Sequence, residues 1–240
     1  MQTIGLIGGI TPQSTIMYYQ VLNDLAAKTF GGIHSSKLII NSLDFGEISR
    51  LQSQGRWDKL DTIMQDAALS LEKSGASMVV ICANTMHLCV EAIKQVVSIP
   101  VIHIAEATAK YIILQNISKV ALLGTKYTME RPFFKDVLKS YEIDTIIPEE
   151  NDREIIHKVI YDELSKGLLL NTSKEAYLKI IKKLIDQGAE GVILGCTEIP
   201  LLINQNDINI PVFDTTTIHA TTAFEKAMHL TKINYNGSKL

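Results

Sequence analysis

A single cysteine stands at a place in the sequence where its thiol could do chemistry. Cys196 directly follows an apolar run, residues 191–195, that predicts a buried strand, and Thr197 and Glu198 come next, where a helix is expected to begin. Backbone N–H groups at a helix start lower the pKa of a nearby thiol from its usual ~8.5 and favour the thiolate, which acts as a base or a nucleophile. A cysteine at a strand end is also commonly a small buried apolar residue. The sequence therefore offers Cys196 as a candidate catalytic residue, with core packing as the alternative.

The sequence contains a second copy of this segment, and that copy lacks the thiol. Residues 75–85 align without gaps on residues 188–198, and the alignment places Ala83 at the position equivalent to Cys196. Cys82 is adjacent to Ala83, but neighbouring side chains on a strand point to opposite faces of the sheet, so Cys82 is not expected to replace it. Either the chemistry is one-sided, or a cysteine has been replaced at residue 83.

Polar side chains stand at the other expected strand ends, where ligands bind in open α/β sheets. Hydroxyl and amide groups there can hold a carboxylate or stabilise negative charge that develops during a reaction. The polar candidates for substrate binding are Thr11, Asn84, Thr85, Thr125 and Thr197, and Ile10 is added because it belongs to the same glycine-containing loop as Thr11. The glycines that precede Ile10 do not spell the GxGxxG pattern of dinucleotide sites. They are interpreted as turn residues that let backbone N–H groups approach a small anion.

The elements that position these residues follow from an internal repeat. Residues 119–125 repeat the strand-to-glycine pattern of residues 3–9, and residues 210–213 repeat residues 99–102. All three repeated segments come in the same order, and strands that alternate with helices predict parallel sheets with helices on both faces. We therefore predict an α/β protein with two pseudo-symmetric three-layer lobes, each with a small, mainly parallel sheet, and an active site in the cleft between the lobes.

The lobe boundaries are predicted from the same repeat. The N-terminal lobe is expected to comprise residues 1–103 together with residues 212–240, because the last helical segment is expected to return to the first half. The C-terminal lobe then comprises residues 104–211. A helix is expected over residues 85–97, where Cys89 is interpreted as a packing residue.

Composition excludes several other classes of protein. The chain has 240 residues, of which 46% are apolar and 20% charged, with a net charge of −3, as in ordinary globular proteins rather than disordered ones. Without basic clusters or a long apolar run, neither nucleic acid nor a membrane is expected as a partner. The 3 cysteines are too few, and odd in number, for a disulfide framework, which fits a cytoplasmic location. The 6 histidines are scattered, so no metal site is predicted.

These motifs resemble those of the cofactor-independent aspartate/glutamate racemase family. The resemblance runs over nearly the whole chain and is most specific at residues 84–87, Asn-Thr-Met-His, and at residues 195–198, Gly-Cys-Thr-Glu, with a further match at residues 124–128. Glu198 after Cys-Thr resembles the aspartate racemase branch. The resemblance implies two pseudo-symmetric α/β lobes, a small-molecule amino-acid substrate, no cofactor and a homodimer.

The resemblance also implies a mechanism in which two cysteines act on opposite faces of the substrate. One thiolate removes the α-proton while the other thiol delivers a proton, and the second cysteine of the chain handles the L enantiomer. The family's two cysteines map to Ala83 and Cys196. Lys166 matches a position that pairs with the second carboxylate of the substrate, which favours aspartate or glutamate; a solvated lysine at a helix end is the alternative. Arg50 and Gln52 are weaker candidates for the same role.

Because alanine cannot carry a proton, we expect this chain to be a very poor racemase that lacks one of its two bases. Two alternatives stay open from the sequence. The chain could be a non-catalytic binder of acidic amino acids, or it could catalyse a decarboxylation or a cis–trans isomerisation, for which a single cysteine suffices.

Overall fold

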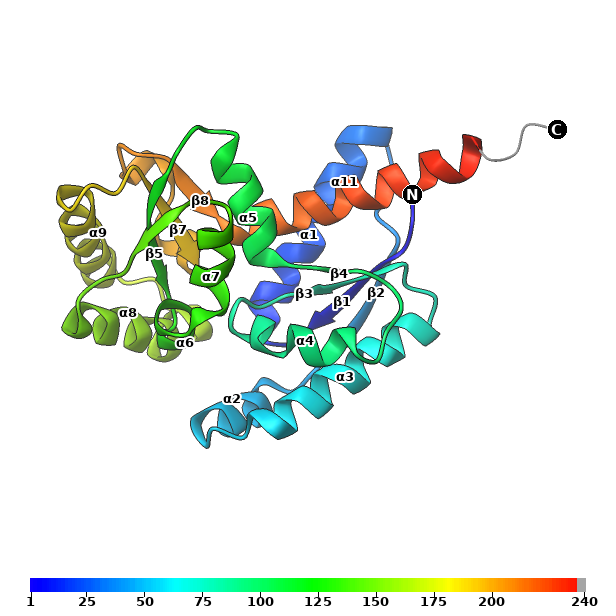
Figure 1. The fold of residues 1–240 in the computed structure, drawn as a ribbon, viewed down its shortest axis with the longest axis horizontal. Helices are drawn as coiled ribbons and strands as arrows, with labels where there is room; N and C mark the ends of the chain where they lie inside the picture. Colours follow the sequence, from blue (N-terminus) through cyan, green and yellow to red (C-terminus); the bar gives the residue numbers. More distant parts are fainter. Residues whose placement is uncertain (237–240) are drawn as a thin grey trace. The chain divides into compact units, whose positions relative to one another are not determined.

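The computed structural model describes residues 1–236 and contains two four-stranded sheets in which all strand pairings are parallel (Figure 1). Their strand orders are β2-β1-β3-β4 and β6-β5-β7-β8. Each sheet therefore has the same order when its strands are numbered from its own first strand, so the repeat in the sequence corresponds to a repeat in topology. The predicted α/β architecture, with a small parallel sheet in each of two lobes, is confirmed.

The first compact unit comprises Met1–His103 and the part of the last helix from His219 on. Its strands are β1 (Ile4–Gly8), β2 (Leu38–Ser42), β3 (Met78–Ile81) and β4 (Val101–Ile102). Its helical segments are α1 (Pro12–Phe30), α2 (Phe45–Ser53), α3 (Trp57–Lys73), the 3-10 helix η1 (Thr85–Cys89), α4 (Val90–Lys94) and most of α11 (Thr215–Asn236).

Helices cover both faces of this first sheet. α3 packs on one face through an apolar cluster that includes Met64, and α1 and α11 pack on the other face through a cluster that includes Tyr18 and Phe224 (Figure 1). The residues at the end of β3 divide between these clusters: Ala83 belongs to the α3 side and Cys82 to the α1 side. The prediction that these two neighbours point to opposite faces is confirmed.

The second compact unit comprises Ile104–Ile218. Its strands are β5 (Lys119–Gly124), β6 (Asp144–Ile146), β7 (Gly191–Gly195) and β8 (Val212–Asp214). Its helices are α5 (Ile104–Ile113), α6 (Lys126–Glu130), α7 (Pro132–Ser140), α8 (Glu150–Asp162), η2 (Leu164–Lys166), α9 (Asn171–Asp186), α10 (Ile199–Leu202) and η3 (Gln205–Asp207).

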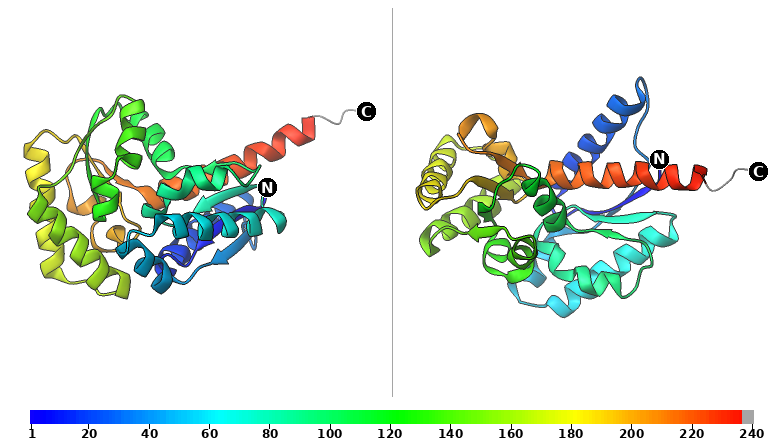
Figure 2. Two further views of the ribbon diagram at one scale, coloured as in Figure 1. Left: turned by 60° about the horizontal axis from the view of Figure 1, so that its bottom comes forward. Right: turned by 45° about the horizontal axis from the view of Figure 1, so that its top comes forward.

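The second sheet is also covered on both faces. α8 and α9 pack on one face through a cluster that includes Tyr177 and Leu194, and α5 and α7 pack on the other through a cluster that includes Phe134 and Ile193 (Figure 2). Leu194 and Ile193 are neighbours on β7, so alternation along this central strand supplies both faces with buried side chains. Cys196 directly follows β7, so its position is fixed by a strand that is buried on both faces.

The predicted assignment of residues 212–218 to the first lobe is wrong. β8 pairs with β7 through the register Ile193↔Phe213, and the second unit extends to Ile218. A strand is placed by its hydrogen-bonded neighbour, and β8 completes the second sheet just as β4 completes the first. The chain enters the first unit again only within α11, at His219. Residues 237–240 of the predicted lobe lie outside the described residues.

The single helix expected over residues 85–97 is also wrong in detail. The segment begins as the 3-10 helix η1 and continues as the short helix α4, with a hydrogen bond of 3.0 Å from the His87 N–H to the Asn84 carbonyl oxygen. Tight 3-10 turns are common where a helix begins. Because of this turn, Asn84 and Thr85 stay close to the end of β3.

None of the helices formed by residues 1–236 combines the length and apolar character that crossing a bilayer requires.

Candidate active site

Cys196 lies beside a buried carboxylate. Its thiol donates a hydrogen bond of 3.0 Å to Oε2 of Glu198, and the Thr197 hydroxyl donates one of 2.8 Å to the same oxygen. All three residues are buried, with Glu198 only 3% exposed. The strand end after β7 therefore combines a proton on sulfur with a carboxylate placed to receive it.

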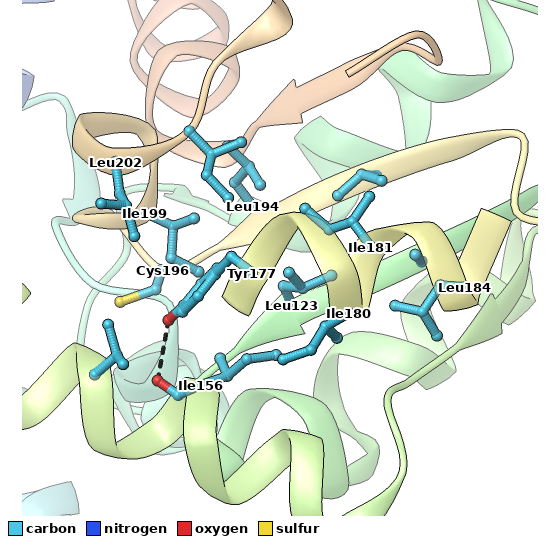
Figure 3. Packing of buried hydrophobic residues seen from close by; sticks show 14 of the residues in the cluster. Leu123, Ile156, Tyr177, Ile180, Ile181, Leu184, Leu194, Cys196, Ile199 and Leu202 are labelled. Carbon is cyan, nitrogen blue, oxygen red and sulfur yellow. Dashed lines mark hydrogen bonds between the residues drawn. The ribbon is translucent and has the colours of Figure 1, made fainter. Parts of the chain in front are cut away.

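The surroundings of Cys196 are apolar on the side of the helices. Figure 3 shows its side chain next to Tyr177, whose hydroxyl donates a hydrogen bond of 3.0 Å to the Ile156 carbonyl oxygen. Ile199 and Leu202 of α10 belong to the same cluster. This packing excludes water from one side of the thiol and holds its backbone in place.

The expected lowering of the Cys196 pKa is wrong. Burial, and then the adjacent Glu198 carboxylate, raise the pKa of the thiol well above its usual value, and this outweighs the opposing backbone hydrogen bonds. The helix that follows, α10, has only 4 residues, so its dipole is short. At neutral pH Cys196 is therefore a protonated thiol.

At the equivalent strand end of the first unit, the chain has no titratable side chain at residue 83. Ala83 is 7% exposed, and Asn84 and Thr85 are also buried. His87, on η1, contacts this segment directly: its Nδ1 lies 2.9 Å from the Ala83 carbonyl oxygen. His87 thus holds the backbone of the segment that Ala83, Asn84 and Thr85 form.

The loop after β1 is a tight turn that needs glycine. Gly9 has φ = +81°, and a Cβ at this position would lie 2.1 Å from the Leu43 carbonyl oxygen. The Gly9 N–H donates a hydrogen bond of 2.8 Å to the Thr15 hydroxyl. Thr11 caps α1, accepting a bond of 3.4 Å from the Ser14 N–H. The turn therefore brings Ile10 and Thr11, both buried, to the start of α1.

The two side chains that were weaker candidates for carboxylate binding lie differently on α2. Gln52 is buried, and its amide donates a hydrogen bond of 3.2 Å to the sulfur of Met86 on η1. Arg50 is exposed and lines a surface pocket with Arg56 and Lys59. Gln52 therefore contacts η1 at Met86, the residue after Thr85, whereas Arg50 is exposed to solvent.

The remaining predicted residues belong to the second unit. Thr125 is buried and caps α6, where its hydroxyl accepts a bond of 3.3 Å from the Thr128 N–H. Lys166 is exposed at the end of η2, directly before Gly167, which has φ = +75°. Thr125 is thus fixed by local structure, whereas the Lys166 side chain is exposed to solvent.

Sequence reasoning missed a histidine cluster in the first unit. The ring centroid of His87 lies 5.0 Å from that of His103 and 5.5 Å from that of His219. The description of the histidines as scattered is therefore wrong for these three, which come from η1, the end of β4 and α11. No signal in the sequence joins them, because contact between distant segments depends on how the sheet is covered. Within residues 1–236, no group of three or more His, Cys, Asp or Glu side chains is arranged to hold a metal ion.

Because of these buried histidines, we expect the free energy of unfolding to depend on pH. Burial lowers the pKa of His219 to about 4 and holds that of His87 well below its ordinary value. Between about pH 6.5 and pH 4 the unfolded chain binds a proton at His219 that the folded chain does not, so the free energy of unfolding falls as the pH falls, by about 3 kcal/mol for this group. His87 adds to the fall, and above about pH 7 neither histidine contributes.

Urea unfolding at a series of pH values measures this effect. We expect His219→Gln, whose amide keeps a donor near the position of Nε2 but does not titrate, to flatten the curve between pH 6.5 and pH 4. His34→Gln, at an exposed position, serves as the control and should leave the slope unchanged. Equal slopes for His219→Gln and the unmodified protein would contradict the assignment.

Known proteins are similar to this chain in both sequence and fold. The family model for Asp/Glu/hydantoin racemases matches residues 7–223. A crystal structure assigned as an Asp/Glu racemase from Yersinia pestis is 45% identical, with a TM-score of 0.89 over 95% of this chain and 100% of that chain. An aspartate racemase homologue from Pyrococcus horikoshii is 37% identical, with a TM-score of 0.83 and the same coverage. The broad specificity amino-acid racemase RacX of Bacillus subtilis is 25% identical, over 88% of this chain and 92% of its own length.

Proposed function

This chain belongs to the Asp/Glu/hydantoin racemase family, and on that basis we propose that it acts at the α-carbon of an acidic amino acid, aspartate or glutamate. The observation that carries the proposal is the Cys196 thiol held at 3.0 Å from the buried Glu198 carboxylate. This pair supplies an acid–base group of the kind that proton transfer at carbon requires. The proposed proton transfers use side chains alone, so the reaction calls for no cofactor.

In the proposed reaction, Cys196 exchanges the α-proton on one face of the substrate. The proton of the resting thiol first passes to Glu198, and the thiolate then removes the α-proton. Negative charge develops on the α-carbon and its carboxylate, where hydroxyl and amide groups such as Thr197, Asn84 and Thr85 would stabilise it. Lys166 would pair with the second carboxylate of the substrate.

On the opposite face of the substrate, we propose that proton transfer falls to residue 83. Alanine has no group that can transfer a proton. Racemisation needs one group to remove the proton and another to deliver a proton on the other side. With Ala83, the α-carbon can regain a proton only from Cys196, on the same face. Once the thiol proton has exchanged with solvent, the chain therefore exchanges the α-proton without inverting the carbon. We therefore propose an amino-acid racemase that performs only half of its reaction.

A second candidate is favoured by the presence of a thiol at only one of the two equivalent strand ends. A decarboxylation or a cis–trans isomerisation of a dicarboxylic acid needs a single cysteine, and Cys196 meets this requirement as well. The substrates of such reactions, malonates and maleate, carry two carboxylates and no amino group. They can therefore be distinguished from amino acids by a binding test.

Thermal unfolding in the presence of ligands tests the proposed substrate class. We expect L-aspartate or L-glutamate at about a hundred times its Kd to raise the unfolding free energy by about 2.7 kcal/mol, whereas alanine and the malonates have little effect. Alanine is a necessary comparison because the Bacillus subtilis relative is named a broad specificity enzyme. Stabilisation by malonates or maleate but not by amino acids would contradict the proposed racemase and favour the decarboxylase or isomerase.

A matched variant identifies the residue that recognises the second carboxylate. Lys166→Met keeps most of the length of the side chain and removes its charge, so it should raise the Kd for aspartate more than tenfold. Lys182→Met, on the exposed surface of α9, is the control. Equal Kd values for the two variants would contradict the role of Lys166.

A further inference from the structure

The histidine cluster lies within the first unit, where His87 contacts the Ala83–Asn84–Thr85 segment and where His103 and His219 adjoin the two points at which the chain leaves and re-enters this unit. Nδ1 of His87 lies 2.9 Å from the Ala83 carbonyl oxygen. Nε2 of His219 lies 2.7 Å from the Ile102 carbonyl oxygen, and Nδ1 of His219 lies 2.7 Å from the Tyr18 hydroxyl. His87 and His219 are 2% and 0% exposed.

The chemistry of the partners fixes the direction of each hydrogen bond. A backbone carbonyl oxygen only accepts, so His87 donates from Nδ1 and His219 donates from Nε2. A neutral histidine that donates from Nε2 accepts at Nδ1, and the Tyr18 hydroxyl therefore donates to His219. Burial lowers the pKa of both rings, so both are neutral at pH 7. The hydrogen bonds of the Tyr18 hydroxyl and of His219 Nε2 then join α1, α11 and the end of β4.

Two members of the cluster stand where the chain passes between the units. The first unit ends at His103 before the chain enters the second at Ile104, and the chain returns to the first unit between Ile218 and His219. His103 and His219 are thus the residues on the first-unit side of both passages. His87 contacts the rings of both, at 5.0 and 5.5 Å between centroids.

We propose that His87 is a positioning residue that holds the Ala83–Asn84–Thr85 segment through its bond to the Ala83 carbonyl oxygen and couples this segment to the two passages of the chain through His103 and His219. Binding of a substrate at Asn84 and Thr85 then changes how well ordered the backbone is at residues 102–104 and around His219. In turn, a change in order at these residues alters the affinity for substrate. Such coupling is reciprocal, because both effects arise from one free energy. The part of the proposal that concerns substrate rests on the proposed function.

His87 variants separate the hydrogen bond from the volume of the ring. In His87→Asn, the amide nitrogen can occupy the position of Nδ1 and donate to Ala83, whereas His87→Leu fills the space and leaves the buried carbonyl without its donor. We expect the Kd for L-aspartate, measured by titration calorimetry, to rise about tenfold or more in His87→Leu and to change less than threefold in His87→Asn. A ring that merely fills space would give the opposite order or no difference, and that result would overturn the proposal.

Tyr18→Phe tests the coupling from the other end without touching His87. It removes the hydroxyl that donates to His219 and leaves the volume almost unchanged, so it is expected to fold even where His87→Leu does not. We expect amide hydrogen exchange measured by mass spectrometry to become at least threefold faster at residues 83–87 as well as at residues 102–104. Faster exchange at residues 102–104 alone would overturn the coupling.

The two readouts distinguish failure of this proposal from failure of the proposed function. If the unmodified protein does not bind L-aspartate or L-glutamate, the proposed function is wrong, and hydrogen exchange without ligand then decides the role of His87. Faster exchange at residues 83–87 in His87→Leu and Tyr18→Phe, but not in His87→Asn, supports the positioning role. Unchanged exchange in all three variants overturns it.

Discussion

The Ala83→Cys variant is expected to racemise aspartate or glutamate about 10²- to 10⁴-fold faster than the chain as it stands, which is the range that a positioned acid–base group contributes. Inversion of an α-carbon needs proton transfer on both of its faces, and Ala83 provides no proton. A thiol at residue 83 would occupy the position equivalent to Cys196 in the repeat and would supply the absent group. Circular dichroism or coupled detection of the opposite enantiomer measures the rate.

Ala83→Ser is the matched control for this experiment. A serine hydroxyl has nearly the same size as a thiol but ionises far less readily, so it should give little or none of the increase. A gain that is equal for serine and cysteine would point to packing rather than acid–base chemistry. Equal activity of Ala83→Cys and the unmodified chain would remove residue 83 from the mechanism.

Cys196→Ser is expected to cause the second large effect, a loss of about 10²- to 10⁴-fold in the rate of α-proton exchange. The loss should be seen in the chain as it stands and in the Ala83→Cys background, because no other thiol replaces Cys196. Cys82 is fully buried on the opposite face of its sheet, and burial together with Asp61 raises the pKa of the Cys89 thiol.

Cys89→Ala is the control for the loss of a thiol as such. It removes a buried sulfur that has no place in the proposed reaction, so it should lower stability without lowering the exchange rate of the folded protein. A comparable loss of exchange in Cys89→Ala and Cys196→Ser would contradict the assignment of Cys196.

Much of the fold could be predicted from the sequence because its determinants are local. Apolar runs such as residues 78–81 and 191–195 are buried strands that lead into helical segments, and the repeat of these runs indicates two sheets of one topology. The alternation of side chains along a strand also predicts correctly that Cys82 and Ala83 face different clusters. These inferences need only the neighbours of a residue along the chain.

The properties that the sequence does not reveal depend on what packs around a residue. The pKa of Cys196 is raised rather than lowered because Glu198 and the thiol are both buried, which no spacing indicates. The contacts of His87 with His219 likewise join distant segments. The limit of the first lobe differs from the prediction because β8 is fixed by its pairing with β7, whereas helical periodicity alone does not identify a partner.

The central claim is that Cys196 exchanges the α-proton of an acidic amino acid on one face only. Proton magnetic resonance of L- and D-aspartate, and of both enantiomers of glutamate, in heavy water with the unmodified chain tests it most directly. We predict that the α-proton signal of one L enantiomer disappears first, without appearance of the D form, and that Cys196→Ser abolishes this loss. Retention of the α-proton in all four substrates, or an equal rate of exchange in Cys196→Ser, would contradict the account.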